Sequence, residues 1–263
     1  VTESYASPVI SDPEGLSAVL RSALDGLSSA RTRRIGLSLP DALFRIQILE
    51  FDELPTGAAD REKLIRWRLE KSAAIDMAGA ALRFQVRKRA ERGHIVLASV
   101  AKQDMIASFE DLLSGLGFEV WTILPSSFSV LNFYAPYLVT RSSTYALTRL
   151  AGGSYSTVIV DGGIPRFYRY REIKASAREE VVGRLVRDLD DTLHFYMHRD
   201  RNQPSEVGHL FVSGETDVMD GLFDALKSGA TMEIERLSPR SVIPALGDEQ
   251  GTLAAAIGAG GLG

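Results

Sequence analysis

The sequence contains no cysteine, which excludes disulfide bonds and every metal site built on thiolate ligands. This composition is typical of a reducing compartment. It also has no excess of positive charge, because 30 Lys and Arg residues face 34 Asp and Glu residues. The net charge of −4 gives no general electrostatic reason to expect a nucleic-acid partner.

The sequence also predicts neither a signal peptide nor a membrane span. The first residues, Val-Thr-Glu-Ser-Tyr, lack the basic and apolar parts of a secretory signal. Residues 120–140 carry no charge, but Pro125, Asn132, Pro136 and several hydroxyl side chains interrupt them. We therefore expect any link to a membrane to run through a partner.

The clearest positive signal is an alternation of strands and helices between His94 and Tyr134. A β-rich run at 94–100 precedes a helical repeat at 105–116, which Gly115 and Gly117 are expected to end with a left-handed cap. A second strand at 118–124 then precedes a helix that begins at Ser126 or Ser127. This order predicts an α/β protein with helices covering the sheet faces.

Other segments extend this pattern in both directions. Asp12 and Pro13 predict the start of a helix with an apolar face for burial, and Arg87, Lys88, Arg89 and Arg92 give one hairpin a basic tip. That tip is interpreted as solvated, with an acidic partner or an anionic lipid surface as the alternative.

Glycine pairs at 152–153 and 162–163 predict an antiparallel meander. The expected helix face is Leu16, Val19, Leu20, Ala23 and Leu27, the expected strands are 35–39, 44–51, 81–88, 209–212 and 234–237, and the expected further helices are 60–71, 175–199 and 252–257.

Motif matches for catalysis are weak. Ser99 and Lys102 match the Ser-x-x-Lys pattern of acyl-serine enzymes, but Ser99 is expected inside a strand. Asp190, His194 and His198 share a helical stripe, where a solvated face with an Asp190–His194 ion pair is favoured over zinc. The run Gly258–Gly263 resembles a dinucleotide fingerprint, but the chain supplies no helix after it.

The order of elements, with particular residues, resembles the PilM family of type IV pilus assembly proteins. The segments that carry the likeness are Ile35–Pro40, Glu62–Lys71, His94–Val130, Thr192–Tyr196 and Phe211–Gly214. The family is related to FtsA and to the cytoplasmic part of GspL. The resemblance implies an actin-like (ribonuclease H-like), two-lobed α/β fold with a small inserted α+β subdomain. The implied division is a first lobe at 1–41 with 119–138 and 248–263, an insert at 42–118, and a second lobe at 139–247.

Actin-like ATPases bind phosphates through two Asp-x-Gly hairpins. The first would precede residue 1 and is missing here. By the resemblance, the second places Thr148 at the Asp position and Leu150 at the Gly position, with Arg149 between them. Ser213, Gly214 and Glu215 stand where the family has its adenosine loop. These substitutions predict a degenerate nucleotide site, so no cofactor and no metal are expected, although full-length family members can hold ATP and magnesium.

The resemblance also implies a partner and a location. We expect a non-catalytic scaffold in the cytoplasm, peripheral at the inner membrane through a short peptide of a PilN-like membrane protein. The peptide would dock between the first lobe and the insert, near Leu39–Phe44, Arg61–Glu70 and the start of the Phe128 helix. A GspL-like secretion adaptor that engages a secretion or pilus motor ATPase, self-association, and an active ATP-binding protein that uses Arg149 remain alternatives.

Overall fold

A computed structural model of the chain describes residues 10, 12–25, 33–72, 75–88, 93–151, 153–173, 178–198, 206–214, 216–227, 232–247 and 251–260. The chain divides into two compact units, Val1–Ser126 and Ser127–Gly263. The lobe and insert boundaries expected from the sequence remain predictions, and each unit is described by itself.

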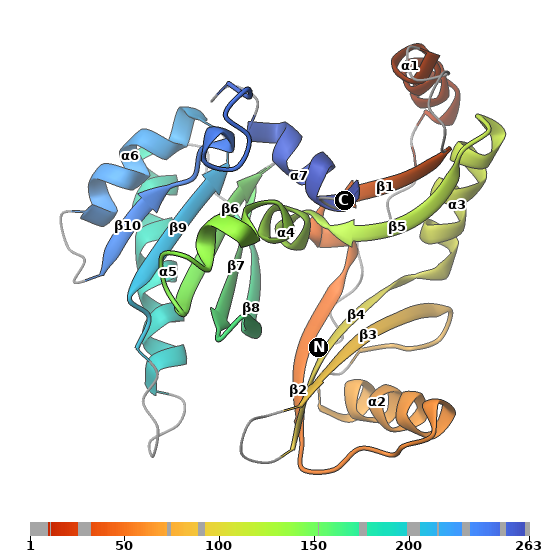
Figure 1. Cartoon of the computed structure of the whole chain (residues 1–263), viewed down its shortest axis with the longest axis horizontal. Coiled ribbons are helices and arrows are strands. Elements are labelled where there is room, and N and C mark those ends of the chain that lie inside the picture. Colours follow the sequence, from red (N-terminus) through yellow and green to blue (C-terminus); the bar gives the residue numbers. More distant parts are fainter. Residues whose placement is uncertain are drawn as a thin grey trace. The chain divides into compact units, whose positions relative to one another are not determined.

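The first unit contains two small sheets and three α-helices among its described residues (Figure 1). Its elements are α1 (Pro13–Asp25), β1 (Arg34–Leu39), the short helix η1 (Asp41–Leu43), β2 (Arg45–Phe51), α2 (Ala58–Ser72), β3 (Ala80–Lys88), β4 (His94–Lys102), α3 (Gln103–Gly115) and β5 (Glu119–Pro125).

The larger sheet of this unit is antiparallel, with strands in the order β2-β4-β3. The amphipathic helix α2 covers one face of it, because Ile65 and Leu69 are both 0% exposed and pack on the sheet. The hairpin of β3 and β4 confirms the strand pairing predicted from the sequence. Arg89 and Arg92 of the expected basic tip lie outside the described residues.

The smaller sheet pairs β1 and β5 in parallel. Helix α3 directly precedes β5 in the chain, and it ends as the sequence predicts. Gly117 has φ +83°, its N–H donates to Ser114, and the N–H of Phe118 donates to Leu113. These two bonds form the Schellman motif that satisfies the last carbonyl groups of a helix.

Helix α1 forms as predicted, but its predicted burial is wrong. The N–H of Gly15 donates to Asp12 Oδ1 at 2.8 Å, which is the expected N-terminal cap. However, Val19 is 67% exposed, Leu16 and Leu20 are only half-buried, and Ala23 is exposed. An apolar stripe favours burial, but it cannot specify which surface will cover it. Leu27 lies outside the described residues.

The second unit is built on one five-stranded mixed sheet with the strand order β10-β9-β6-β7-β8. Its elements are α4 (Ser126–Leu138), β6 (Thr144–Ala151), β7 (Ser154–Asp161), β8 (Ile164–Glu172), α5 (Arg178–His198), β9 (His209–Gly214), α6 (Thr216–Lys227), β10 (Glu233–Arg236), the short helix η2 (Pro239–Ser241) and α7 (Gly251–Gly260).

The antiparallel meander predicted for 143–173 is confirmed as β6, β7 and β8. Gly162 and Gly163 have φ values of +56° and +76° in the second turn, which explains the glycine pair there. Strand β9 joins β6 in parallel, and β10 joins β9 in parallel, so the sheet is antiparallel on one side and parallel on the other.

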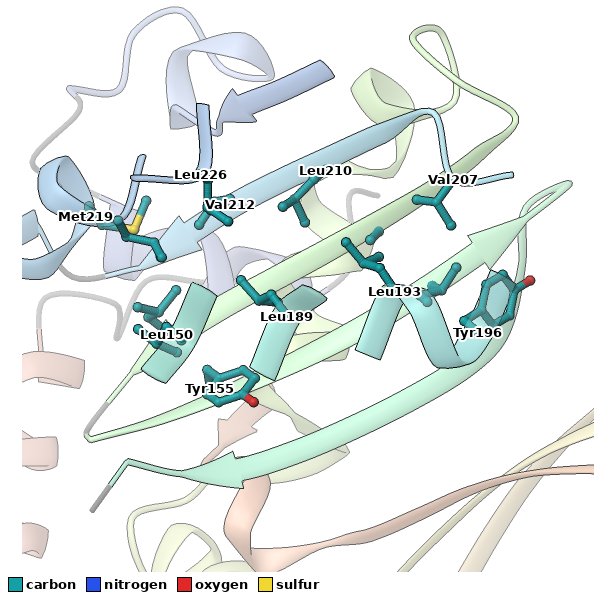
Figure 2. Close-up of a cluster of buried hydrophobic side chains, with 14 residues drawn as sticks. Leu150, Tyr155, Leu189, Leu193, Tyr196, Val207, Leu210, Val212, Met219 and Leu226 are labelled. Carbon is teal, nitrogen blue, oxygen red and sulfur yellow. The ribbon is translucent and has the colours of Figure 1, made fainter. Parts of the chain in front are cut away.

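The core of this unit lies between one face of the sheet and the helices α5 and α6. In Figure 2, Leu189 and Leu193 of α5 lie against Leu210 and Val212 of β9, and all four are at most 5% exposed. The buried members are Ala146, Leu150, Tyr155, Ile159, Leu185, Leu189, Leu193, Tyr196, Val207, Leu210, Val212, Met219, Leu222 and Leu226.

Helix α7 packs closely on α4 through glycine. A Cβ atom added at Gly258 would overlap the carbonyl oxygen of Ser129 and would lie 3.1 Å from the backbone nitrogen of Phe133. The glycine-rich run Gly258–Gly263 thus begins inside a helix rather than in a phosphate loop, and residues 261–263 lie outside the described part. Within the described ranges, no helix has the length and apolar character needed to cross a membrane.

Candidate functional site

The residue predicted to stand at the second Asp-x-Gly turn, Thr148, lies inside a strand. It is 0% exposed in the middle of β6, and its hydroxyl shares a hydrogen bond of 2.9 Å with the hydroxyl of Thr157 on β7. Leu150, at the expected glycine position, is also in β6 and is 5% exposed in the core. A phosphate-binding turn needs exposed backbone amides, so these two positions do not offer one.

Arg149 and Ser213 lie side by side on neighbouring parallel strands. The register pairs Arg149 of β6 with Ser213 of β9, and it pairs Thr148 with Val212. Arg149 is half-buried and Ser213 is 7% exposed. The structure therefore places an arginine and a serine beside each other at the carboxyl ends of two parallel strands, where α/β sheets commonly bind ligands.

Gly214 ends β9 in close contact with β6. Its φ is +148°, and a Cβ atom there would overlap the carbonyl oxygen of Leu150. Only glycine fits this crossing, so the residue has a packing role whatever the site binds. Glu215, the last predicted site residue, lies outside the described residues.

The Asp161-Gly162 turn is at the opposite end of the sheet from Arg149 and Ser213, because the register pairs Asp161 with Thr144 at the start of β6. Asp161 accepts a hydrogen bond of 2.9 Å from Thr144 and lies 3.6 Å from the guanidinium nitrogen of Arg166. Its carboxylate is used within the meander. No group of three or more His, Asp or Glu side chains in the described ranges is placed to hold a metal ion.

The other motif matches also have structural roles. Ser99 is in β4, which confirms the strand interpretation and removes the helix start that a Ser-x-x-Lys enzyme needs. His194 and His198 are stacked with ring centroids 4.7 Å apart on the exposed side of α5. No ion pair of Asp190 with His194 is found among the described residues, where His194 contacts His198 instead.

The region expected to dock a peptide is held by polar contacts within the first unit. Ser126 donates a hydrogen bond of 3.1 Å to Asp41, and both side chains are at most 7% exposed. Arg61 of α2 donates to the carbonyl oxygens of Pro55 and Thr56 at 3.0 Å. The two bonds of Arg61 fix the start of α2. Further along the same helix, the side chain of Trp67 is 52% exposed.

Two features of the structure were not predicted from the sequence. A cavity of about 1160 Å³ lies between α1 and α3, with Ala18 and Arg21 on one side and Met105 and Leu112 on the other. In the second unit, His209 is 7% exposed and lies 3.1 Å from Glu233. Neither has a sequence signature, because each depends on residues that are distant in the chain.

Buried His209 is part of a polar cluster that links three elements. Its second ring nitrogen lies 3.7 Å from Glu235, and Tyr137 of α4 donates a hydrogen bond to the same carboxylate. Burial and this hydrogen bond raise the pKa of Tyr137. The ring of His209 stacks on Phe211 with centroids 4.5 Å apart. The cluster joins α4, β9 and β10, so it serves packing within the unit.

Comparison with known proteins gives a fold. No family model matches the sequence, and no curated protein matches it. A solved PilM-PilN type IV pilus biogenesis complex matches with a TM-score of 0.76 at 17% identity, over 94% of this chain and 84% of that one. A Bacteroides thetaiotaomicron protein with an actin-like ATPase fold and unknown function gives a TM-score of 0.49 at 11% identity, covering 90% of this chain and 80% of its own.

The cytoplasmic domain of EpsL, an inner membrane component of the type II secretion system of Vibrio cholerae, gives a TM-score of 0.45 at 14% identity and covers 82% of each chain. The likeness to PilM extends over nearly the whole chain, which confirms the α/β fold predicted from the sequence. The chain therefore has an actin-like fold and is similar to PilM.

Proposed function

We propose that this chain is a non-catalytic actin-like scaffold that docks a short cytoplasmic peptide of a PilN-like membrane protein. The single observation that carries this proposal is the likeness in fold to a PilM-PilN complex over 94% of the chain. A role in the cytoplasm, peripheral at the inner membrane, is part of the same proposal. A shared fold supports a function only when the residues of the site agree with it.

The nucleotide region supports a scaffold rather than an ATPase. Thr148, which the resemblance puts at the carboxylate position, lies inside β6, and its hydroxyl bonds that of Thr157 in the core. A magnesium-bound nucleotide needs oxygen ligands that face solvent or substrate, and Thr148 faces neither. One observation favours an ATP-binding alternative, since Arg149 beside Ser213 combines groups that bind phosphate.

The peptide region supports docking through an aromatic anchor. Trp67 lies on α2 within the segment implied by the resemblance, and its ring is 52% exposed. Tryptophan residues frequently dominate the binding energy of an interface because they bury a large apolar surface. We propose that the PilN-like peptide covers Trp67, with the start of α2 fixed by Arg61.

The chain offers a matched control for this assignment. It has two tryptophans, and Trp121 on β5 is 64% exposed, with the guanidinium of Arg34 lying 4.7 Å from its ring centroid. A Trp121→Phe variant leaves Trp67 as the single indole reporter, whose emission should shift to shorter wavelength when the PilN-like peptide binds. Trp67→Ala should weaken binding by about tenfold, whereas Trp121→Ala should leave it unchanged. Equal affinity of Trp67→Ala and the parent protein would refute this placement of the peptide.

A further inference from the structure

Strand β3 lies at an edge of its sheet. The strand order β2-β4-β3 leaves β3 paired with β4 on one side only, along all nine residues from Ala80 to Lys88 (Figure 1). The outer edge of such a strand presents backbone N–H and C=O groups at alternate residues, and these groups can pair with an added strand. This edge is long for a strand at the margin of a sheet.

The two faces of β3 differ in character. Phe84 and Val86 are half-buried and pack against the core that α2 covers. Arg83, Gln85 and Arg87 point to the other face and are exposed. An added strand would therefore meet an apolar margin on one face and a basic row on the other.

The basic row is available for a partner. Arg83 and Arg87 are four residues apart, which corresponds to about 13 Å along a strand. Arg83 donates only to the neighbouring carbonyl of Leu82 at 3.2 Å, and neither guanidinium forms an ion pair with a carboxylate in the described ranges. The chain as a whole has a net charge of −4, so this local row of cations does not follow from a generally basic composition.

We propose that the outer edge of β3 binds an extended acidic peptide of a partner protein by strand addition. Backbone pairing would supply affinity, and two carboxylates four residues apart would pair with Arg83 and Arg87. The alternate side chains of the peptide would be apolar and would extend the surface of Phe84 and Val86. This surface belongs to β3 rather than to α2, and the proposal does not depend on the proposed function.

The decisive probe is a nine-residue peptide of alternating valine and polar residues, with glutamates at two polar positions four residues apart. Its affinity is measured calorimetrically against the whole chain. Arg83→Glu/Arg87→Glu should reduce the affinity by about tenfold, because two opposite-charge pairs become like-charge pairs. A peptide with lysines in place of the glutamates should bind this double variant and not the parent protein.

Two controls separate the proposal from its alternatives. Arg21→Glu/Arg187→Glu changes the net charge equally at exposed positions outside β3 and should leave peptide binding intact. A peptide with proline at its centre should fail to bind, because it cannot complete the backbone pairing. If the proline peptide binds as well as the original, or if the lysine peptide does not rescue the double variant, strand addition at β3 is wrong.

A second measurement fixes the register. Because the chain has no cysteine, Gln85→Cys introduces a single thiol between the two arginines. It should form a disulfide with a peptide cysteine placed midway between the two glutamates, and not with one placed at the peptide end. If vesicles of anionic phosphatidylglycerol bind through Arg83 and Arg87 while the peptide shows no binding, the basic row is a lipid contact and the proposal is overturned.

Discussion

Thr148 and Thr157 lie opposite each other on β6 and β7, and their hydroxyl groups share a hydrogen bond of 2.9 Å. Both side chains are 0% exposed. The position expected to correspond to a metal-binding carboxylate is therefore part of the interior of the sheet.

This pairing predicts a non-additive effect on stability. Thr148→Val leaves the Thr157 hydroxyl buried without its partner and should lower the free energy of unfolding by about 1–3 kcal/mol. Thr148→Val/Thr157→Val removes both polar groups and should cost less than the sum of the two single changes. Urea denaturation of the four proteins measures the coupling. Strictly additive losses would mean that the two hydroxyls do not depend on each other.

The variant Thr148→Asp tests whether residue 148 lies in a buried strand or in a phosphate-binding turn. A carboxylate at this 0% exposed position lacks water and a cation, so it should destabilise the fold strongly. A turn position would accept the aspartate with little loss. A melting temperature unchanged by Thr148→Asp would return this residue to the candidate nucleotide site.

The contact of α7 with α4 predicts opposite responses from two glycines of one helix. Gly258→Ala should destabilise the protein by about 1–3 kcal/mol, because its methyl group would overlap the Ser129 carbonyl. Gly260→Ala meets no atom within 4 Å and should be neutral or slightly stabilising. Thermal denaturation of both variants is the measurement. Equal melting temperatures would show that α7 does not pack on α4 in this way.

Buried tyrosines predict a loss of stability at alkaline pH. Burial raises the pKa of Tyr145 to about 12, and burial together with the nearby Asp188 carboxylate raises the pKa of Tyr155. In the unfolded chain both phenols ionise near pH ~10. Above that pH the unfolded state loses protons that the native state keeps, so the free energy of unfolding falls as pH rises.

The loss should be complete for Tyr145 once the pH passes its native pKa of about 12. Urea midpoints measured from pH ~9 upward should decrease, and Tyr145→Phe should make the decrease shallower. An identical pH profile for the variant would show that Tyr145 ionises as freely in the native state as in the unfolded chain.

Local features of the fold were predictable because neighbouring residues determine them. The cap of α3 follows from Gly117, and the meander follows from the glycine turns around Gly162. The cap of α1 likewise follows from Asp12. In each case one residue type has a conformational or hydrogen-bonding property that the alternatives lack.

Features that depend on distant contacts were not predictable. The apolar stripe of α1 suggested burial, but Val19 is exposed, because a sequence does not say which surface reaches a helix. The resemblance predicts Thr148 at a turn, whereas strand pairing with Val212 and Thr157 puts it in the core. The neighbours Arg149 and Ser213 were identified as candidates, but their adjacency required the register.

The central claim is that the chain docks its partner without using nucleotide. The most direct test is calorimetric titration of a PilN-like cytoplasmic peptide into the protein, once with EDTA and no nucleotide and once with saturating Mg-ATP. The scaffold proposal predicts the same dissociation constant in both titrations and no release of phosphate. Binding that appears only with Mg-ATP, or phosphate release that Arg149→Ala abolishes, would contradict it and would favour an active nucleotide site beside Ser213.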